Sequence, residues 1–248
     1  GNVSGTSGVN VSINGGTTAY SADVETASVE ILPFEIKILL STAGAASNDS
    51  TVGLNSWDPE DIISIGDPNF QIEPGISSGT FGLISDYLKT AGDVGFSINA
   101  LHYVGQALTV GQGAFTFDLQ VGDMLVTVSD NVTFRGNSTS ISVTNEDVFV
   151  FRPVDVANND YRSGDFFELL HSSAGVGNEF NGLTLVQKDL NIGGAPLSTG
   201  SFLFTSAALT PNNIYHFTPD QVGAGAASAS GTTTTQVYGD DLSLGAAD

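Results

Sequence analysis

The side chains best suited to chemistry in this sequence are carboxylates, and several of them stand in adjacent pairs. Two carboxyl groups that converge in a cleft could act together in a glycosidase. Two of the pairs, however, precede strand-like segments at the same relative position, where an aspartate in a turn caps backbone amides. We therefore interpret these two pairs as structural. The pairs are Glu60/Asp61, Glu146/Asp147 and Asp240/Asp241, and the first two are the structural ones.

Turns rich in Asp and Asn offer a second kind of chemistry, because Ca²⁺ binds several oxygen ligands at once. Such turns occur at 48–50, 158–161 and 238–241. None of them matches the loop of an EF-hand or the nonapeptide repeat of calcium-binding toxins. Calcium is therefore an alternative rather than an expectation, and no other cofactor is predicted. The candidate ligands are Asp160, Asp240 and Asp241.

The other groups that commonly catalyse reactions lack a recognisable spacing. His102, His171 and His216 form no paired zinc-binding motif. The segment Gly-Ile-Ser-Ser-Gly at 75–79 leads into a β-like segment, whereas the nucleophile elbow of a hydrolase leads into a helix. The chain has no Cys, which excludes thiolate nucleophiles and Cys-based zinc sites. The sequence thus predicts a protein that is not an enzyme.

Aromatic residues are mostly Phe at strand positions, where packing in a core explains them. Trp57 stands apart, in the segment Asn-Ser-Trp-Asp-Pro-Glu-Asp ahead of a strand. A Trp in such a place can stack on a sugar or anchor an interface, or it can be partly buried against its own turn. We take Trp57 as an interface candidate.

The charge balance limits the partners. The chain of 248 residues has 27 Asp and Glu but only six Lys and Arg, and its formal net charge is −21. No two of the six cations are adjacent, so a nucleic acid or an anionic membrane surface would not find the cluster of cations that it needs. No apolar run reaches the roughly 18 residues of a membrane-spanning helix. We therefore expect neither nucleic acid binding nor membrane insertion.

Short β-branched apolar runs separated by Gly, Asn, Asp and Pro predict an all-β fold. The segment Ile84–Ala91 could be helical, because Leu83, Tyr87 and Leu88 share a helical face, but it matches a clear β segment elsewhere and we interpret it as a strand. The clearest strand candidates are Ile36–Thr42, Asp61–Gly66, Met124–Ser129, Asp147–Arg152, Phe202–Ser206 and Asn213–Thr218.

Four landmarks recur in one order and indicate about three degenerate four-stranded units. They are a turn and strand (22–34, 92–104 and 175–186), a second strand (36–42, 123–129 and 200–206), a strand that ends near Pro (60–68, 146–153 and 212–219) and a further strand (79–88, 164–173 and 234–242). Such units could form propeller-like blades or a β-sandwich. Three are too few for an ordinary closed propeller.

Part of this repeat resembles a known kind of module. A strand ending in Phe-x-Pro is followed by a spacer, a further strand and the Asp/Gly-rich turn Tyr-Gly-Asp-Asp-Leu-Ser-Leu-Gly, with the best match over Phe217–Leu244. This order is similar to the tandem repeats of certain large secreted bacterial surface proteins. The resemblance implies an extracellular repeat module and carries over no catalytic residue.

The first residues follow a different pattern. Residues 1–18 are rich in Gly, Asn, Ser and Thr, and Val9, Val11 and Ile13 alternate with polar residues. A strand of this kind could pair along a sheet edge of the same molecule or of a neighbour, and the second arrangement would give a head-to-tail filament. We therefore expect an extended arm at 1–18, with these three residues as a donor strand, and an all-β repeat domain at 19–248.

Together these observations predict a secreted or cell-surface structural or adhesive protein, which associates with itself, with another surface protein or with a glycan. A calcium- or glycan-binding module is the first alternative, and a polysaccharide-acting enzyme is the second. N-glycosylation would fit a secreted protein, although Ser/Thr-rich chains also produce sequons by chance. The sequons begin at Asn2, Asn10, Asn48, Asn131 and Asn137.

Overall fold

The computed structural model describes residues 37–47, 56–66, 80–85, 96–156, 160–171, 180–192, 194–206, 209–210, 213–223 and 230–237. The chain divides into two units, Gly1–Pro33 and Phe34–Asp248, and every described residue belongs to the second. The predicted arm at 1–18, with Val9, Val11 and Ile13, therefore lies outside the described residues.

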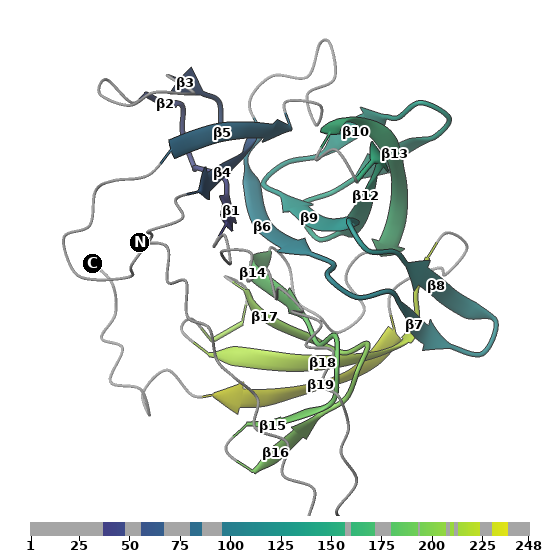
Figure 1. Ribbon diagram of the computed structural model, residues 1–248. Helices are drawn as coiled ribbons and strands as arrows, with labels where there is room; N and C mark the ends of the chain where they lie inside the picture. The colour runs from purple at the N-terminus through teal and green to yellow at the C-terminus, as the bar shows by residue number, and fades with distance from the viewer. Residues whose placement is uncertain are drawn as a thin grey trace, which may run out of the picture. The chain divides into compact units, whose positions relative to one another are not determined.

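All regular elements among the described residues are β-strands, which confirms the all-β prediction (Figure 1). The first sheet along the chain, called here the N-terminal sheet, is antiparallel and has three described strands in the order β1-β4-β5. The short pair β2-β3 comes between β1 and β4 in the sequence. The bounds are β1 Lys37–Leu40, β2 Ala46–Ser47, β3 Ser56–Trp57, β4 Ile62–Gly66 and β5 Thr80–Ser85.

The middle sheet is antiparallel and has the order β13-β12-β9-β6. One hairpin, β7-β8, is inserted between β6 and β9, and another, β10-β11, between β9 and β12. The bounds are β6 Ile98–Tyr103, β7 Leu108–Gln112, β8 Phe115–Leu119, β9 Met124–Val128, β10 Val132–Arg135, β11 Ser140–Val143, β12 Val148–Asp155 and β13 Asp160–Leu170.

The C-terminal sheet repeats this plan with the order β14-β17-β18-β19, and the hairpin β15-β16 is inserted between its first two strands. The bounds are β14 Phe180–Leu185, β15 Leu190–Ile192, β16 Ala195–Leu197, β17 Phe202–Ser206, β18 Ile214–Gln221 and β19 Ser230–Val237. Both four-stranded sheets are therefore simple meanders with a hairpin in the same place.

The two meanders also share their register. Pro153 of β12 lies opposite Gly164 of β13, and Pro219 of β18 lies opposite Gly231 of β19. The pairing is interrupted just after each proline in both sheets. The equivalent of the segment that begins at Gly164 thus begins at Gly231, three residues before the predicted fourth landmark of the last unit at 234–242.

The Phe-x-Pro order has a structural reason in both sheets. The pairing of β12 with β9 ends at Phe151, and that of β18 with β17 ends at Phe217. Pro153 and Pro219 come two residues later, where their strands have a partner on one side only. The missing N–H of proline is tolerated at such an edge position.

Turns closed by an aspartate precede β4, β9 and β12. Asp61, Asp123 and Asp147 each donate the backbone N–H to the carbonyl three residues earlier, at 3.0, 3.1 and 3.1 Å. A carboxylate oxygen of each accepts the N–H of that same earlier residue, at 2.8, 2.8 and 2.6 Å. The prediction that Asp61 and Asp147 cap backbone amides is confirmed. Ser201 closes an equivalent turn before β17.

The middle sheet is buried on both faces, because its strands alternate between two cores. Leu125 and Val150 belong to a core that also contains Phe202 and Phe217 of the C-terminal sheet. The other face contributes to a second core, which the hairpin β10-β11 covers. The second core includes Met124, Val126, Phe149, Phe151, Phe166, Phe134 and Val143.

The strand predictions agree with the structure within a few residues at each end, and Phe202–Ser206 agrees fully. The strand interpretation of Ile84–Ala91 holds for its first two residues, which end β5, and the rest of that segment lies outside the described residues. No sheet closes into a barrel in the part of the chain that the structure describes. A propeller or a sandwich stays a prediction.

Candidate functional site

An open groove with a volume of about 660 Å³ lies between β8, β11 and β13. The chain just after β18, at Val222 and Gly223, completes its wall. Two hairpins and the edge strand of the middle sheet therefore build the groove, and the C-terminal sheet contributes its border.

The groove presents aromatic rings and hydroxyl groups side by side. Phe115 and Phe117 of β8 and Phe167 of β13 line it, and Phe115 is 38% exposed. Thr116 and Ser140 line it as exposed residues. This mixture suits a ligand that has both an apolar surface and hydroxyl groups.

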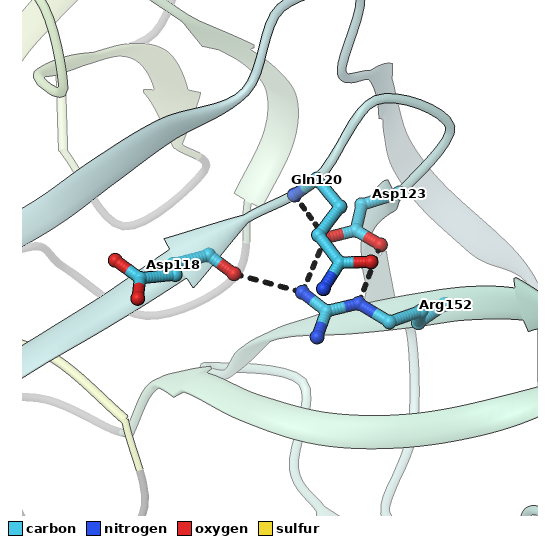
Figure 2. A network of polar contacts seen from close by, with 4 residues as sticks. All are labelled: Asp118, Gln120, Asp123 and Arg152. Atoms are coloured by element: carbon cyan, nitrogen blue, oxygen red, sulfur yellow. Dashed lines mark hydrogen bonds and ion pairs between the residues drawn. The ribbon is translucent and has the colours of Figure 1, made fainter.

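Arg152 of β12 lies at the centre of a polar network beside the groove (Figure 2). Its Nε donates to Asp123 Oδ1 at 2.9 Å, and its Nη2 donates to Asp123 Oδ2 and to the backbone oxygen of Asp118, both at 2.8 Å. Asp123 Oδ2 also accepts the backbone N–H of Gln120 at 2.8 Å. The Asp123 side chain is 1% exposed and that of Arg152 24%. The charge of Arg152 is thus neutralised inside the protein.

The guanidinium of Arg152 also fixes two rings of the groove. It lies 5.5 Å from the ring centre of Phe117 and 5.2 Å from that of Phe167, and the two ring centres are 5.9 Å apart. A cation over an aromatic face contributes about 0.5 to 2 kcal/mol, depending on how far it is desolvated. Arg152 therefore holds hairpin β7-β8 against β13 and sets the spacing of the two rings.

The opposite wall is tied to β13 by Asp165. Its Oδ1 accepts the N–H of Ser138 at 2.6 Å, the N–H of Thr139 at 3.1 Å and the Thr139 hydroxyl at 3.4 Å. The hydrogen bond from the Ser138 backbone is the main reason why the pKa of Asp165 is lowered. Phe166 N–H in turn donates to Thr139 Oγ1 at 2.8 Å. The turn of β10-β11 is thus fastened to the edge of the middle sheet.

Glu168 is the one charged residue among those that line the groove. Its Oε1 lies 2.7 Å from His171 Nδ1, which is also 3.4 Å from Asp147 Oδ1. Burial raises the pKa of Glu168, the charge of His171 opposes this effect, and the charge of Asp147 adds to it. The groove therefore offers a hydrogen-bonding carboxyl group and no cationic side chain.

Comparison of the chain with protein-family models, with curated protein sequences and with solved structures finds no match. Among the described residues, no helix is long and apolar enough to cross a membrane.

The predicted site residues do not gather at the groove. Trp57, taken as an interface candidate, is only 9% exposed, and its Nε1 donates to Thr42 Oγ1 at 3.1 Å. The side chain is therefore mostly buried, and a role of Trp57 at an interface stays a prediction. Asn131 and Asn137 are exposed beside β10, and their glycosylation stays a prediction. Asn2, Asn10 and Asn48 lie outside the described residues.

Of the three candidate calcium ligands, the structure describes only Asp160. Asp160 begins β13, and its backbone lies opposite Asp155. Asp240 and Asp241 lie outside the described residues. The described residues contain no group of three or more His, Asp or Glu that could hold a metal ion. Calcium binding therefore stays a prediction without a site among them.

His102 of β6 joins the two meanders. Its Nε2 lies 3.2 Å from Gln187 Nε2, which can only donate. Gln187 Oε1 accepts the N–H groups of Gly105 and Gln106, at 2.7 and 2.8 Å, which fixes the amide orientation. His102 Nε2 therefore carries no proton and accepts this hydrogen bond. Burial lowers the pKa of His102 from 6.5 to about 4.

The His102→Gln variant is expected to lose less stability in acid than the wild type. Because the pKa of His102 is lower in the folded state, the unfolded state binds more protons between pH 6.5 and 4, and stability falls as the pH drops through this window. Urea unfolding at pH 7 and pH 4.5 should show a loss about 2 kcal/mol larger in the wild type than in His102→Gln. Equal losses in the two proteins would contradict this role.

Sequence reasoning missed the residues that build the groove. Core packing is the general expectation for Phe at strand positions, and no motif in the sequence singles out Phe115, Phe117 or Arg152. A signal was present, since an Arg between Phe and Pro in a buried strand requires a carboxylate. The sequence could not show that Asp123, after another turn, supplies it.

Proposed function

We propose that this chain is an extracellular adhesive protein that binds a neutral carbohydrate in the groove between β8, β11 and β13, without catalysing a reaction on it. The observation that carries the proposal is the lining of the groove, where the exposed ring of Phe115 and two half-buried rings stand beside exposed hydroxyl groups and a single carboxyl group. Its extracellular location is supported by the resemblance to secreted repeat modules.

Each part of this lining matches a part of a sugar. The C–H face of a pyranose ring is apolar and can pack on Phe115, which is the most accessible ring. Sugar hydroxyl groups can exchange hydrogen bonds with Thr116, Ser140 and Glu168. An open groove, unlike a closed pocket, also accepts a ligand that continues at both ends, as a polysaccharide does.

An anionic glycan fits the groove less well. The only charged lining residue is Glu168, and the charge of nearby Arg152 is taken by Asp123. The net charge of −21 adds a long-range repulsion of anions, which salt screens. The ligand class that remains is a neutral, hydroxyl-bearing chain.

Calorimetric titration of the wild type with cellohexaose, chitohexaose and mannohexaose tests the proposal. Binding of at least one of them is expected, and Phe115→Ala should weaken it about fivefold or more, because an aromatic contact of about 1 kcal/mol is lost. Thr116→Ala should weaken it by a smaller factor. Thr232→Ala, an exposed Thr of β19 away from the groove, is the matched control and should bind as the wild type does.

Two results would contradict the proposal. One is the absence of binding to all three neutral hexasaccharides at millimolar concentration. The other is an affinity that Phe115→Ala leaves unchanged, which would place the ligand elsewhere on the molecule.

A further inference from the structure

We infer that the carbohydrate-binding surface continues from the groove over strand β11 into a second hollow on hairpin β10-β11, so that the ligand is a chain of several sugar residues. This inference rests on the proposed function, because it extends the same surface and keeps the same class of ligand. The evidence for it is the place, the lining and the rigidity of the second hollow.

The second hollow has a volume of about 290 Å³ and lies beside β10 and β11. Residues 131–133 and 142–144 line it. Ser142 of β11 lines both this hollow and the groove. The two depressions are therefore adjacent, and a ligand that leaves the groove past Ser142 enters the hollow.

The hollow offers the same kind of hydrogen-bonding groups as the hydroxyl-lined side of the groove. Its polar side chains are those of Asn131, Thr133, Ser142 and Thr144, and none of the described residues that line it is charged. Arg135, the cation of β10, pairs with Ser140 of β11 and is not among the lining residues of either depression. Amide and hydroxyl side chains both donate and accept hydrogen bonds, as the hydroxyl groups of a neutral sugar require.

A row of hydroxyl groups along β11 joins the two depressions. Ser140 and Ser142 line the groove, and Ser142 and Thr144 line the hollow. Because a strand rises about 3.3 Å per residue, the row extends over about 13 Å from Ser140 to Thr144. A single sugar ring is shorter than this row. Only a chain of several sugar residues can therefore contact all of it.

The hydroxyl groups in the hollow are oriented and still have free hydrogen-bonding capacity. Thr133 Oγ1 and Ser142 Oγ lie 2.9 Å apart and share one hydrogen bond. Since a hydroxyl group can donate one hydrogen bond and accept two, the pair keeps one donor and several acceptor positions. Ser142 is exposed and Thr133 is half-buried, so a ligand can reach them.

The hairpin is held in place at both ends of this row. At one end, Asp165 Oδ1 accepts the N–H groups of Ser138 and Thr139, at 2.6 and 3.1 Å. At the other end, Asp147 Oδ2 accepts the N–H of Thr144 at 2.6 Å. A surface that is ordered before the ligand arrives loses less conformational freedom on binding. The row is therefore a preorganised continuation of the groove.

The double variant Asn131→Ala/Thr133→Val tests the inference, because both residues line the hollow and neither lines the groove. Calorimetry compares the disaccharide and the hexasaccharide of the cello-, chito- and manno-series. The protein is produced without N-glycosylation, since Asn131 begins a sequon. The double variant should bind the hexasaccharide about fivefold more weakly than the wild type, because hydrogen bonds in the hollow are lost. It should bind the disaccharide within about twofold of the wild type, which also shows that it is folded.

Blocking the hollow is an independent test. The chain has no Cys of its own, so the Asn131→Cys variant can be modified at this one position with N-ethylmaleimide. The modified protein should lose about fivefold in affinity for the hexasaccharide and keep its affinity for the disaccharide. Thr232→Cys, modified in the same way on β19, is the matched control and should bind both as the wild type does.

The outcomes separate this inference from the proposed function. A longer chain has more ways to occupy the groove, so proteins are compared with the same oligosaccharide rather than lengths with each other. If the wild type binds none of the oligosaccharides, both proposals are wrong. If Phe115→Ala weakens hexasaccharide binding but the two changes in the hollow do not, the groove binds carbohydrate and the inference is overturned. Equal losses for disaccharide and hexasaccharide in the hollow variants would also overturn it.

Discussion

The Gly164→Ala variant is expected to unfold with a free energy about 3 kcal/mol lower than that of the wild type. A Cβ at this position would overlap the Arg152 carbonyl oxygen and would lie 2.6 Å from the ring of Phe151, which is closer than van der Waals contact. Neither neighbour can move easily, since one is backbone of the paired strand and the other is a fully buried ring. The added methyl group must therefore push β12 and β13 apart.

Gly231→Ala should have an effect of the same size, because the second meander makes the same contact. There a Cβ would meet the Thr218 carbonyl oxygen and would lie 2.6 Å from the ring of Phe217. Urea unfolding at pH 7 measures both variants. Gly105→Ala is the control, since its Cβ would meet only Gln187 Oε1, at 3.7 Å, and its effect should stay within about 0.5 kcal/mol. If neither Gly164→Ala nor Gly231→Ala lowered the free energy of unfolding, the paired strands β12-β13 and β18-β19 would be able to accommodate the methyl group, and the prediction would be wrong.

These two glycines show what a sequence can reveal of a repeat. The Phe-x-Pro order of β12 and β18 was visible, because it depends on residues close together in the chain. The glycine opposite each proline was not aligned correctly in the last unit, because its place is set by pairing with another strand. In β19 the Thr-rich segment 232–235 offers few apolar landmarks, so register alone identifies Gly231.

The all-β class and most strands followed from local patterns, but the groove did not. Its walls come from β8, β11 and β13, which meet only when two hairpins fold back on the middle sheet. The alternation of Phe115 and Phe117 marks a strand and does not reveal that one ring stays exposed. The burial of Trp57 is equally hard to predict, since a Trp in a turn-like segment is compatible with an interface and with partial burial, and the side chain is 9% exposed.

The Asp123→Asn variant is expected to lose about 3 kcal/mol of unfolding free energy. Asparagine keeps the shape of the side chain but removes the negative charge that meets the guanidinium of Arg152 at 2.8 Å. Arg152→Met should lose a similar amount, because it leaves the carboxylate of Asp123, 1% exposed, without its cation. Urea unfolding at pH 7 gives both values.

The chain itself supplies the control for this pair. At the equivalent positions the C-terminal sheet has Ser201 and Thr218, and Ser201 closes the turn before β17 without any ion pair. The double variant Asp123→Ser/Arg152→Thr should therefore lose less than either single change, by about 1.5 kcal/mol or more, because no buried charge is left uncompensated. A second double variant, Asp123→Asn/Arg152→Met, combines the two single changes. If its loss equalled the sum of the two single losses, Asp123 and Arg152 would contribute independently. In that case the network would not hold Phe117 and Phe167 in the groove through its charges, and the spacing of those rings would depend on packing alone.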